Sequence, residues 1–327
     1  MIRVSFEVDP PEAVEALAVV ASTGLPEGPQ FVRPRVSGEE GIATLEFPVE
    51  NWGPDVTMLV SGLVAGEWAD LAAFERCRLV ELTVPDGAFP GPAFAAQPGV
   101  SVGAIVKPSL GLSPEEVAEA AAIFARGGAA LVKDDELLGN PPWCPLEDRV
   151  QAVAAVLPEE TVYAANVTGP ADSLLRRAER AVELGATALM LNVFAQGLDS
   201  LRTLREAELG VPLFAHRVGA ALLMRDRPVS VAPAVLAGLT RMCGADFVQA
   251  GSFSGRLFDD PEDVRACIAA ARPATAVLSG GVGPENAAAE VEHALTRDGL
   301  MLVVGSDAYL YPGGPEAGIR ATIEAVR

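Results

Sequence analysis

The sequence predicts an α/β protein with two parts: a C-terminal (β/α)8 TIM barrel and a smaller N-terminal α+β domain. Two observations support this prediction. From residue 99 to residue 327, short apolar segments alternate regularly with amphipathic segments of helical length. Residues 1–98 lack this alternation, and they end in the Pro- and Gly-rich stretch PDGAFPGPAFAAQPG, which is typical of a link between domains.

Eight segments of the C-terminal part are predicted as strands, because each is an apolar run too short for a buried helix and is bounded by turn residues. They span residues 101–108, 130–136, 161–168, 188–194, 212–218, 246–253, 275–282 and 300–307. The segments between them open with Ser, Pro or acidic residues and end at Gly, as helices do. This number of strand–helix units favours a closed parallel barrel. A doubly wound open sheet is the alternative, but no GxGxxG motif follows the first strand.

The N-terminal part has a mixed pattern. The segments IRVSFEVD, GIATLEFPV and RLVELTV read as strands, and helices are expected near residues 11–21 and 66–75. We therefore place the domain boundary between residues 98 and 99, with the barrel as the catalytic domain.

Composition excludes several classes of protein. The 24 basic and 44 acidic residues give a net charge of −20, with no basic stretch, which argues against a nucleic-acid or membrane partner. The four cysteines are widely spaced and form no CxxC motif, as expected for reduced thiols in a cytoplasmic protein. No segment has the apolar character of a signal peptide or a membrane span.

Polar residues recur at the predicted C-terminal ends of the strands, where barrels of this kind carry their active sites. In chain order these are Lys107, Lys133, Asp135, Glu136, Asn166, Asn192, His216, Arg217, Ser252, Ser279, Gly280, Gly281, Gly305, Ser306 and Asp307. A structural role at the ends of strands does not easily explain so many polar groups.

The stretch LVKDDELLGN (131–140) sets a lysine against three carboxylates in an otherwise apolar strand. Alternation along a strand directs Lys133 and Asp135 to one side and Asp134 to the other, while Glu136 stands where the strand ends. Two carboxylates alone are a poor cage for a hard divalent cation, which favours several oxygen ligands. A lysine that reacts with carbon dioxide becomes a carbamate and adds one. An ion pair between Lys133 and Asp135 is the alternative that this stretch leaves open.

Residues 103–150, GAIVKPSLGLSPEEVAEAAAIFARGGAALVKDDELLGNPPWCPLEDRV, resemble the first barrel segment of the ribulose-bisphosphate carboxylase (RuBisCO) large-subunit superfamily. FAHR and VLSGGV resemble its later signatures, at the fifth and seventh strands. The resemblance covers most of the barrel with the motifs in the family's order. In the N-terminal part it is weaker and rests chiefly on ASTG at 21–24.

The resemblance implies a role for each matched residue. Lys133 would carry a carbamate and bind Mg²⁺ together with Asp135 and Glu136. Lys107 would handle substrate protons, and His216 would contact substrate hydroxyls. The residues implied in holding anionic groups of the substrate are Arg217, Ser279, Gly280, Gly281, Gly305 and Ser306.

The chain also departs from the carboxylase pattern. The loop after the sixth strand offers Arg256 where the family has a lysine that clamps carbon dioxide, and arginine is no neutral replacement there. The resemblance also implies a glutamate where this chain has Val20, Thr-Trp at Leu25-Pro26, an asparagine near Gly62, and histidines at Ala220 and Gln249. The pattern therefore resembles a RuBisCO-like protein (form IV), a non-carboxylating branch of the superfamily.

Three functions follow as hypotheses. The first is Mg²⁺-dependent enolisation or isomerisation of a small phosphorylated ketose-like compound through an enediolate. The second is decarboxylation or carboxyl transfer on a β-keto sugar acid, which reaches the same enediolate by losing carbon dioxide. The third, a non-catalytic binding protein, predicts a decayed metal site, whereas Lys133, Asp135 and Glu136 are intact. In the superfamily, the N-terminal domain of one subunit covers the barrel of another, so the resemblance implies a homodimer or a higher homo-oligomer of dimers.

Overall fold

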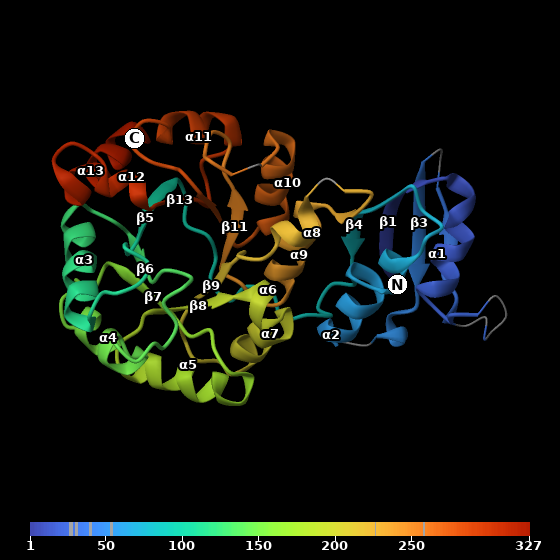
Figure 1. Ribbon diagram of the computed structural model, residues 1–327, viewed down its shortest axis with the longest axis horizontal. Coiled ribbons are helices and arrows are strands. Elements are labelled where there is room, and N and C mark those ends of the chain that lie inside the picture. The colour runs from blue at the N-terminus through green and yellow to red at the C-terminus, as the bar shows by residue number, and fades with distance from the viewer. Residues whose placement is uncertain (26–28, 30–31, 39–40, 53–54, 226, 258) are drawn as a thin grey trace.

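The computed structural model describes residues 1–327 except residues 26–28, 30–31, 39–40, 53–54, 226 and 258. An N-terminal sheet with its own helices lies beside a larger barrel that is ringed by helices (Figure 1). This arrangement confirms the predicted fold class.

The barrel is closed by eight strands, each hydrogen-bonded in parallel to its neighbours in the order β11-β12-β13-β5-β6-β7-β8-β9. The strands are β5 (Val100–Ile105), β6 (Leu131–Lys133), β7 (Val162–Asn166), β8 (Ala188–Asn192), β9 (Leu213–His216), β11 (Phe247–Gly251), β12 (Thr275–Ser279) and β13 (Leu300–Val304). Each overlaps one of the eight predicted segments, because a strand buried on both faces reads as a continuous apolar run.

Helices cover the outside of the barrel (Figure 1). The longer ones are α3 (Pro114–Arg126), α4 (Leu146–Ala154), α5 (Leu174–Glu183), α7 (Leu198–Glu206), α9 (Pro233–Met242), α10 (Pro261–Ala271), α11 (Ala287–Ala294) and α13 (Gly314–Ala325). Short helical segments are α6 (Val193–Gln196), α8 (Ala221–Met224), α12 (Ser306–Tyr309) and the 3-10 helix Ala171–Ser173. Ser113 begins α3 with a capping box, in which its hydroxyl accepts from the Glu116 backbone. In the described part of the chain, no helix is long and apolar enough to cross a membrane.

The barrel interior is filled by a compact apolar cluster. Its buried members are Leu131, Ala164, Ala188, Met190, Phe214, Val277, Met301 and Val303. A barrel of this size is packed with side chains, so it is no open channel. The polar residues of the strand ends therefore rest on an apolar base.

The N-terminal sheet has five strands in the order β10-β4-β1-β3-β2. They are β1 (Ile2–Asp9), β2 (Arg35–Ser37), β3 (Ile42–Phe47), β4 (Arg76–Thr83) and β10 (Val229–Val231). β10 comes from the chain between α8 and α9 and pairs in parallel with β4, so the second half of the chain completes the sheet of the first. The predicted boundary at residues 98 and 99 lies in the segment between β4 and β5.

The helices of the N-terminal part differ from the prediction. The expected helix near 11–21 forms as the 3-10 helix Pro11–Ala13 followed by α1 (Val14–Val20). The prediction of a helix near residues 66–75 is wrong beyond the first turn of that segment. Only the 3-10 helix Glu67–Asp70 forms, because Glu75 donates its backbone N–H to Asp9 at 2.8 Å and leads into β4. Unpredicted helical segments are Val49–Asn51 (3-10), α2 (Val56–Leu59) and Val60–Val64 (a π-helix).

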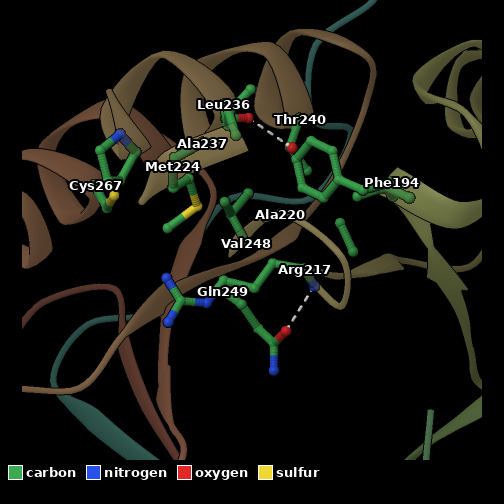
Figure 2. Close-up of a pocket in the computed structure, with 13 residues that line it drawn as sticks. Phe194, Arg217, Ala220, Met224, Leu236, Ala237, Thr240, Val248, Gln249 and Cys267 are labelled. Carbon is green, nitrogen blue, oxygen red and sulfur yellow. Dashed lines mark hydrogen bonds between the residues drawn. The ribbon is translucent and has the colours of Figure 1, made fainter. Parts of the chain in front are cut away.

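A small cavity of about 10 Å³ lies between the barrel wall and α9. Figure 2 shows its lining, which includes Val248 from β11 and Leu236 from α9. This volume holds about one water molecule, so it is a packing defect rather than a substrate pocket.

Candidate active site

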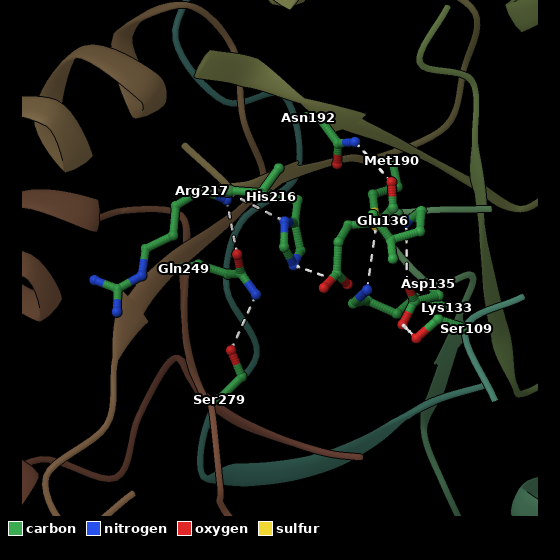
Figure 3. Close-up of polar contacts among 12 residues, drawn as sticks. Ser109, Lys133, Asp135, Glu136, Met190, Asn192, His216, Arg217, Gln249 and Ser279 are labelled. Carbon is green, nitrogen blue, oxygen red and sulfur yellow. Dashed lines mark hydrogen bonds and ion pairs between the residues drawn. The ribbon is translucent and has the colours of Figure 1, made fainter. Parts of the chain in front are cut away.

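The predicted site residues gather at one end of the barrel because its strands run parallel (Figure 3). The strand ends provide Lys107 after β5, Lys133 in β6, His216 in β9, Ser279 in β12, and Gly305 with Ser306 after β13. A Cβ on Gly305 would lie 4.0 Å from Cε of Lys107, which places the turn after β13 beside that lysine.

Lys133 lies at the bottom of the site with 0% of its surface exposed. Its Nζ donates to the backbone oxygen of Asp134 at 2.7 Å and approaches the sulfur of Met190 at 3.4 Å. It also stands 5.7 Å from the centre of the Phe214 ring. Burial among these groups lowers the pKa of the Lys133 ammonium to about 8, although nearby Glu136 and Asp135 oppose that shift. The amine is therefore partly neutral near physiological pH, and the neutral amine is the form that reacts with carbon dioxide.

Asp134 points away from Lys133, as alternation along the strand predicted. Its carboxylate accepts from Arg149 Nε at 3.1 Å, from the Tyr163 hydroxyl at 2.9 Å and from the Asn166 backbone N–H at 2.8 Å. Both partners of the Asp134–Arg149 ion pair are fully buried. Asp134 thus anchors β6 to α4, and the Asn166 amide holds the backbone oxygens of Asp135 and Glu136 at 3.1 and 3.2 Å.

Asp135 faces Lys107. Its Oδ2 accepts a short hydrogen bond from Lys107 Nζ and a second one from the Ser109 hydroxyl at 3.0 Å. Lys107 Nζ also donates to Ser109 Oγ at 2.9 Å. The alternative pairing of Asp135 with Lys133 is not what forms, since the partner of this carboxylate is Lys107.

Glu136 faces His216, with 3.5 Å between Oε2 and Nε2. Burial, and then the positive charges of Lys133 and Arg217, hold the pKa of His216 well below its usual value. The neutral ring accepts a hydrogen bond at Nδ1 from the Val218 backbone at 3.2 Å, so this geometry assigns its proton to Nε2. His216 therefore presents a neutral donor to the site.

Asn192 is a site residue to which the sequence assigned no role. It ends β8 beside His216 on β9, and its Nδ2 donates to the Glu136 backbone oxygen at 2.8 Å. Its Oδ1 is buried without a hydrogen-bond partner, and such acceptors are uncommon in folded proteins. Figure 3 shows Asn192, Glu136 and His216 around one region of the site. The sequence signal for this residue was the asparagine that ends the apolar segment ALMLN (188–192).

A second signal lies in the lysine count. Lys and Arg together number 24, yet only two of them are lysines, Lys107 and Lys133. Arginine is effectively never neutral in a protein, whereas a lysine amine can act as a base or a nucleophile. Both lysines of the chain therefore lie in this site, and every other basic residue among the 24 is an arginine.

The donor set fits a hard cation only if Lys133 contributes an oxygen. Among the described residues, no three His, Cys, Asp or Glu side chains are grouped so as to hold a metal ion. With a carbamate on Lys133, the anionic ligands would be Lys133, Asp135 and Glu136. The buried Oδ1 of Asn192 has no hydrogen-bond partner, so it could accept a hydrogen bond from a group bound in the site. Asp135 would have to release Lys107. The residues fit magnesium under these two conditions.

Of the residues expected to hold anions, Arg217, Ser279, Gly280 and Gly281 lie at the ends of β9 and β12, whereas Gly305 lies beside Lys107. Gln249 connects three strands, since its Oε1 accepts from the Arg217 backbone at 2.7 Å and its Nε2 donates to Ser279 Oγ at 3.0 Å. Gly280 and Gly281 have φ of +107° and +100°, which favours glycine. In Figure 3 the guanidinium of Arg217 points away from the Glu136 cluster.

Comparison with known proteins identifies the family. Residues 93–277 match the family described as "Ribulose bisphosphate carboxylase large chain, catalytic domain". The match spans more than half of the chain, so the chain belongs to this family, as the resemblance of its motifs predicted.

Two curated relatives carry the names of other reactions. The "Putative 2,3-diketo-5-methylthiopentyl-1-phosphate enolase" of Shouchella clausii is 31% identical over 88% of this chain and 83% of the relative. The "3-oxo-isoapionate-4-phosphate transcarboxylase/hydrolase" of Xanthobacter autotrophicus is 30% identical over 84% of this chain and 72% of the relative. Among solved structures, the octameric ribulose-1,5-bisphosphate carboxylase/oxygenase of Pyrococcus horikoshii matches with a TM-score of 0.88 and 26% identity, over 99% of this chain and 87% of that chain.

The burial of Lys133 predicts a pH-dependent stability. Its pKa falls from 10.5 to about 8 on folding, so between these values the unfolded state binds more protons and the free energy of unfolding rises with pH. Below that window both states are protonated and the gain is absent. In metal-free and carbon-dioxide-free buffer, we expect urea unfolding of the wild type, relative to Lys133→Met, to show a rise on the order of 3 kcal/mol across the window. A difference that stays flat with pH would contradict the buried ammonium.

Proposed function

We propose that the protein is an enzyme that catalyses the magnesium-dependent enolisation or isomerisation of a small phosphorylated ketose-like compound, without fixing carbon dioxide. The observation that carries the proposal is the cluster of Lys107, Lys133, Asp135 and Glu136 at the barrel mouth. The name of the Shouchella clausii relative, an enolase of a phosphorylated diketo compound, supports the same reaction class.

The expected cofactor is Mg²⁺, held by Asp135, Glu136 and a carbamate on Lys133. The carbamate forms when the neutral amine of Lys133 bonds to the carbon of carbon dioxide and a proton is released. When bound, the ion would stabilise the negative charge that develops on substrate oxygens during enolisation. The lowered pKa of Lys133 supports this role, because it increases the share of the neutral amine.

Proton transfer is assigned to Lys107. Once it leaves Asp135 and is neutral, its Nζ accepts the proton from the carbon next to the substrate carbonyl, which leaves the enediolate. His216, neutral and protonated at Nε2, donates to a substrate hydroxyl. The substrate phosphate is assigned to donors of the turn after β13, Gly305 and Ser306, while Ser279, Gly280 and Gly281 of the turn after β12 donate to other substrate oxygens.

Decarboxylation or carboxyl transfer on a β-keto sugar acid is the second candidate. It is favoured by the name of the Xanthobacter autotrophicus relative, a transcarboxylase/hydrolase of a phosphorylated oxo acid. The same enediolate then arises by cleavage of a carbon–carbon bond. Lys107 would return a proton to that enediolate instead of removing one.

The lack of carboxylation is inferred from the positions that depart from the carboxylase pattern. Gly62 is one of them, and a Cβ there would lie 2.5 Å from Nε1 of Trp52, so an asparagine would displace that indole. Gln249, in place of a histidine, is committed to Arg217 and Ser279. Pro26 lies outside the described residues, while Val20 and Leu25 offer only apolar side chains.

We also infer a homodimer, or a higher homo-oligomer of dimers, with the substrate as its small-molecule ligand. The octameric assembly of the Pyrococcus horikoshii protein supports this inference. In Figure 1, α1 lies on the side of the N-terminal sheet far from the barrel. This helix, which ends at Val20, is therefore remote from the barrel of its own chain. A cytoplasmic location is inferred too, and it is supported by the four buried cysteines, which are free thiols.

Replacing Lys107 separates the two candidate reactions. If the reaction begins with proton abstraction, Lys107→Ala and Lys107→Arg should both slow exchange of the substrate's α-hydrogen with deuterated solvent, by about 100- to 10,000-fold. The arginine variant keeps the charge that pairs with Asp135 but supplies no base. Exchange is followed by NMR in a screen of phosphorylated ketoses.

A decarboxylase would give a different result with the same variants. Carbon dioxide release from a β-keto acid would continue, while stereospecific uptake of solvent hydrogen would be lost. An unchanged rate of both steps in Lys107→Ala would remove Lys107 from the mechanism.

Ribulose bisphosphate should not be carboxylated. Fixation requires a clamp on the gas, and Arg256 stands where the family has its lysine. We expect no acid-stable product from labelled carbon dioxide above the level of a Lys133→Ala control. Labelled product well above that control would show that the protein is a carboxylase.

A further inference from the structure

The guanidinium of Arg217 is already paired with a carboxylate of its own chain. Its Nη2 lies 2.8 Å from Oδ1 and 2.6 Å from Oδ2 of Asp259. The two side chains are only 18% and 9% exposed, so solvent screens this pair weakly. Asp259 also accepts the backbone N–H of Ser252 at 3.2 Å, which ties the loop after β11 to the pair.

The end of β11 is shaped to receive this ion pair. Gly251 has φ of +112° and ends the strand at an irregularity in its pairing with β12. A Cβ on Gly251 would lie 2.7 Å from Oδ2 of Asp259 and 3.2 Å from Nη2 of Arg217. A side chain at this position would push the ion pair apart, so the pair requires glycine at position 251.

The ion pair borders the candidate active site. Arg217 follows His216 directly, and its backbone is joined through Gln249 to the hydroxyl of Ser279. The loop that carries Asp259 packs on the glycine turn, since the backbone N–H of Arg256 donates to Gly280 at 3.0 Å. The pair therefore lies beside Gln249 and the glycine turn after β12, at the edge of the candidate site.

We propose that Asp259 is a specificity-determining residue that neutralises Arg217, so that this end of the site accepts an uncharged part of the substrate and disfavours a second phosphate. A free guanidinium binds phosphate through charge-assisted hydrogen bonds. A guanidinium that shares a carboxylate offers almost no net charge, and Asp259 would repel the phosphate. This inference rests on the proposed function and defines its substrate class as monophosphorylated compounds with an uncharged far end.

Two ligands that differ by one phosphate test the inference. Ribulose 5-phosphate and ribulose 1,5-bisphosphate are titrated into the magnesium- and bicarbonate-treated protein by calorimetry. The wild type should bind the bisphosphate no more tightly than the monophosphate. In Asp259→Asn and Asp259→Ser, the bisphosphate should gain about tenfold or more in affinity, because one charge-assisted contact becomes available, while the monophosphate changes little.

Two further variants show whether the effect comes from Arg217. Asp260→Asn removes the same charge one residue away, where Asp260 caps α10, and asparagine caps equally well. It should leave both affinities unchanged. Adding Arg217→Gln to Asp259→Asn should abolish the gain for the bisphosphate.

Several results would overturn the inference. One is a wild-type protein that already binds the bisphosphate tenfold more tightly than the monophosphate. Another is that the two Asp259 variants keep the wild-type preference, change the affinity for both ligands alike, or bind neither ligand. Failure of the proposed function appears separately, as a wild type with no magnesium-dependent proton exchange on any phosphorylated ketose.

Discussion

The burial of one amine governs the rest of the site. Lys133 ends a short strand above the apolar interior of a closed barrel, where Met190 and Phe214 are its neighbours. An ammonium ion there loses its hydration, which lowers its pKa to about 8. The carboxylates that follow it in the chain act in the opposite direction. Conversion to a carbamate would resolve this conflict, because it turns a costly buried cation into an anion that a divalent cation can hold.

The remaining charges of the site are balanced within the chain. Lys107 is paired with Asp135, and Arg217 is paired with Asp259. The two pairs have different consequences, because a metal ion would compete for Asp135 and thereby release Lys107 for proton transfer. Asp259 lies beyond the proposed ligands, so its pair with Arg217 persists and restricts what binds at that end. The same type of contact would therefore serve activation at one end of the site and substrate selection at the other.

Much of the fold and the cluster around Lys133 could be predicted from the sequence, since both depend on local patterns. Apolar runs marked all the barrel strands, and alternation placed Asp134 opposite Lys133. β10 could not be found this way, because three residues, Val229–Val231, become a strand only by pairing with the distant β4. The ion-pair partners of Lys107 and Arg217 could not be predicted either, since they lie 28 and 42 residues away along the chain. The role of Asn192 depends on a contact with the backbone of Glu136, which no side-chain pattern records.

The central claim is that Lys133 becomes a carbamate that binds magnesium, and ¹³C NMR with labelled bicarbonate tests it directly. The sequence has only two lysines, so few amines compete for the label. The account predicts a carbamate resonance that strengthens when magnesium is added, persists in Lys107→Arg and disappears in Lys133→Met. A spectrum with no such resonance, or one in which it survives Lys133→Met, would contradict the account.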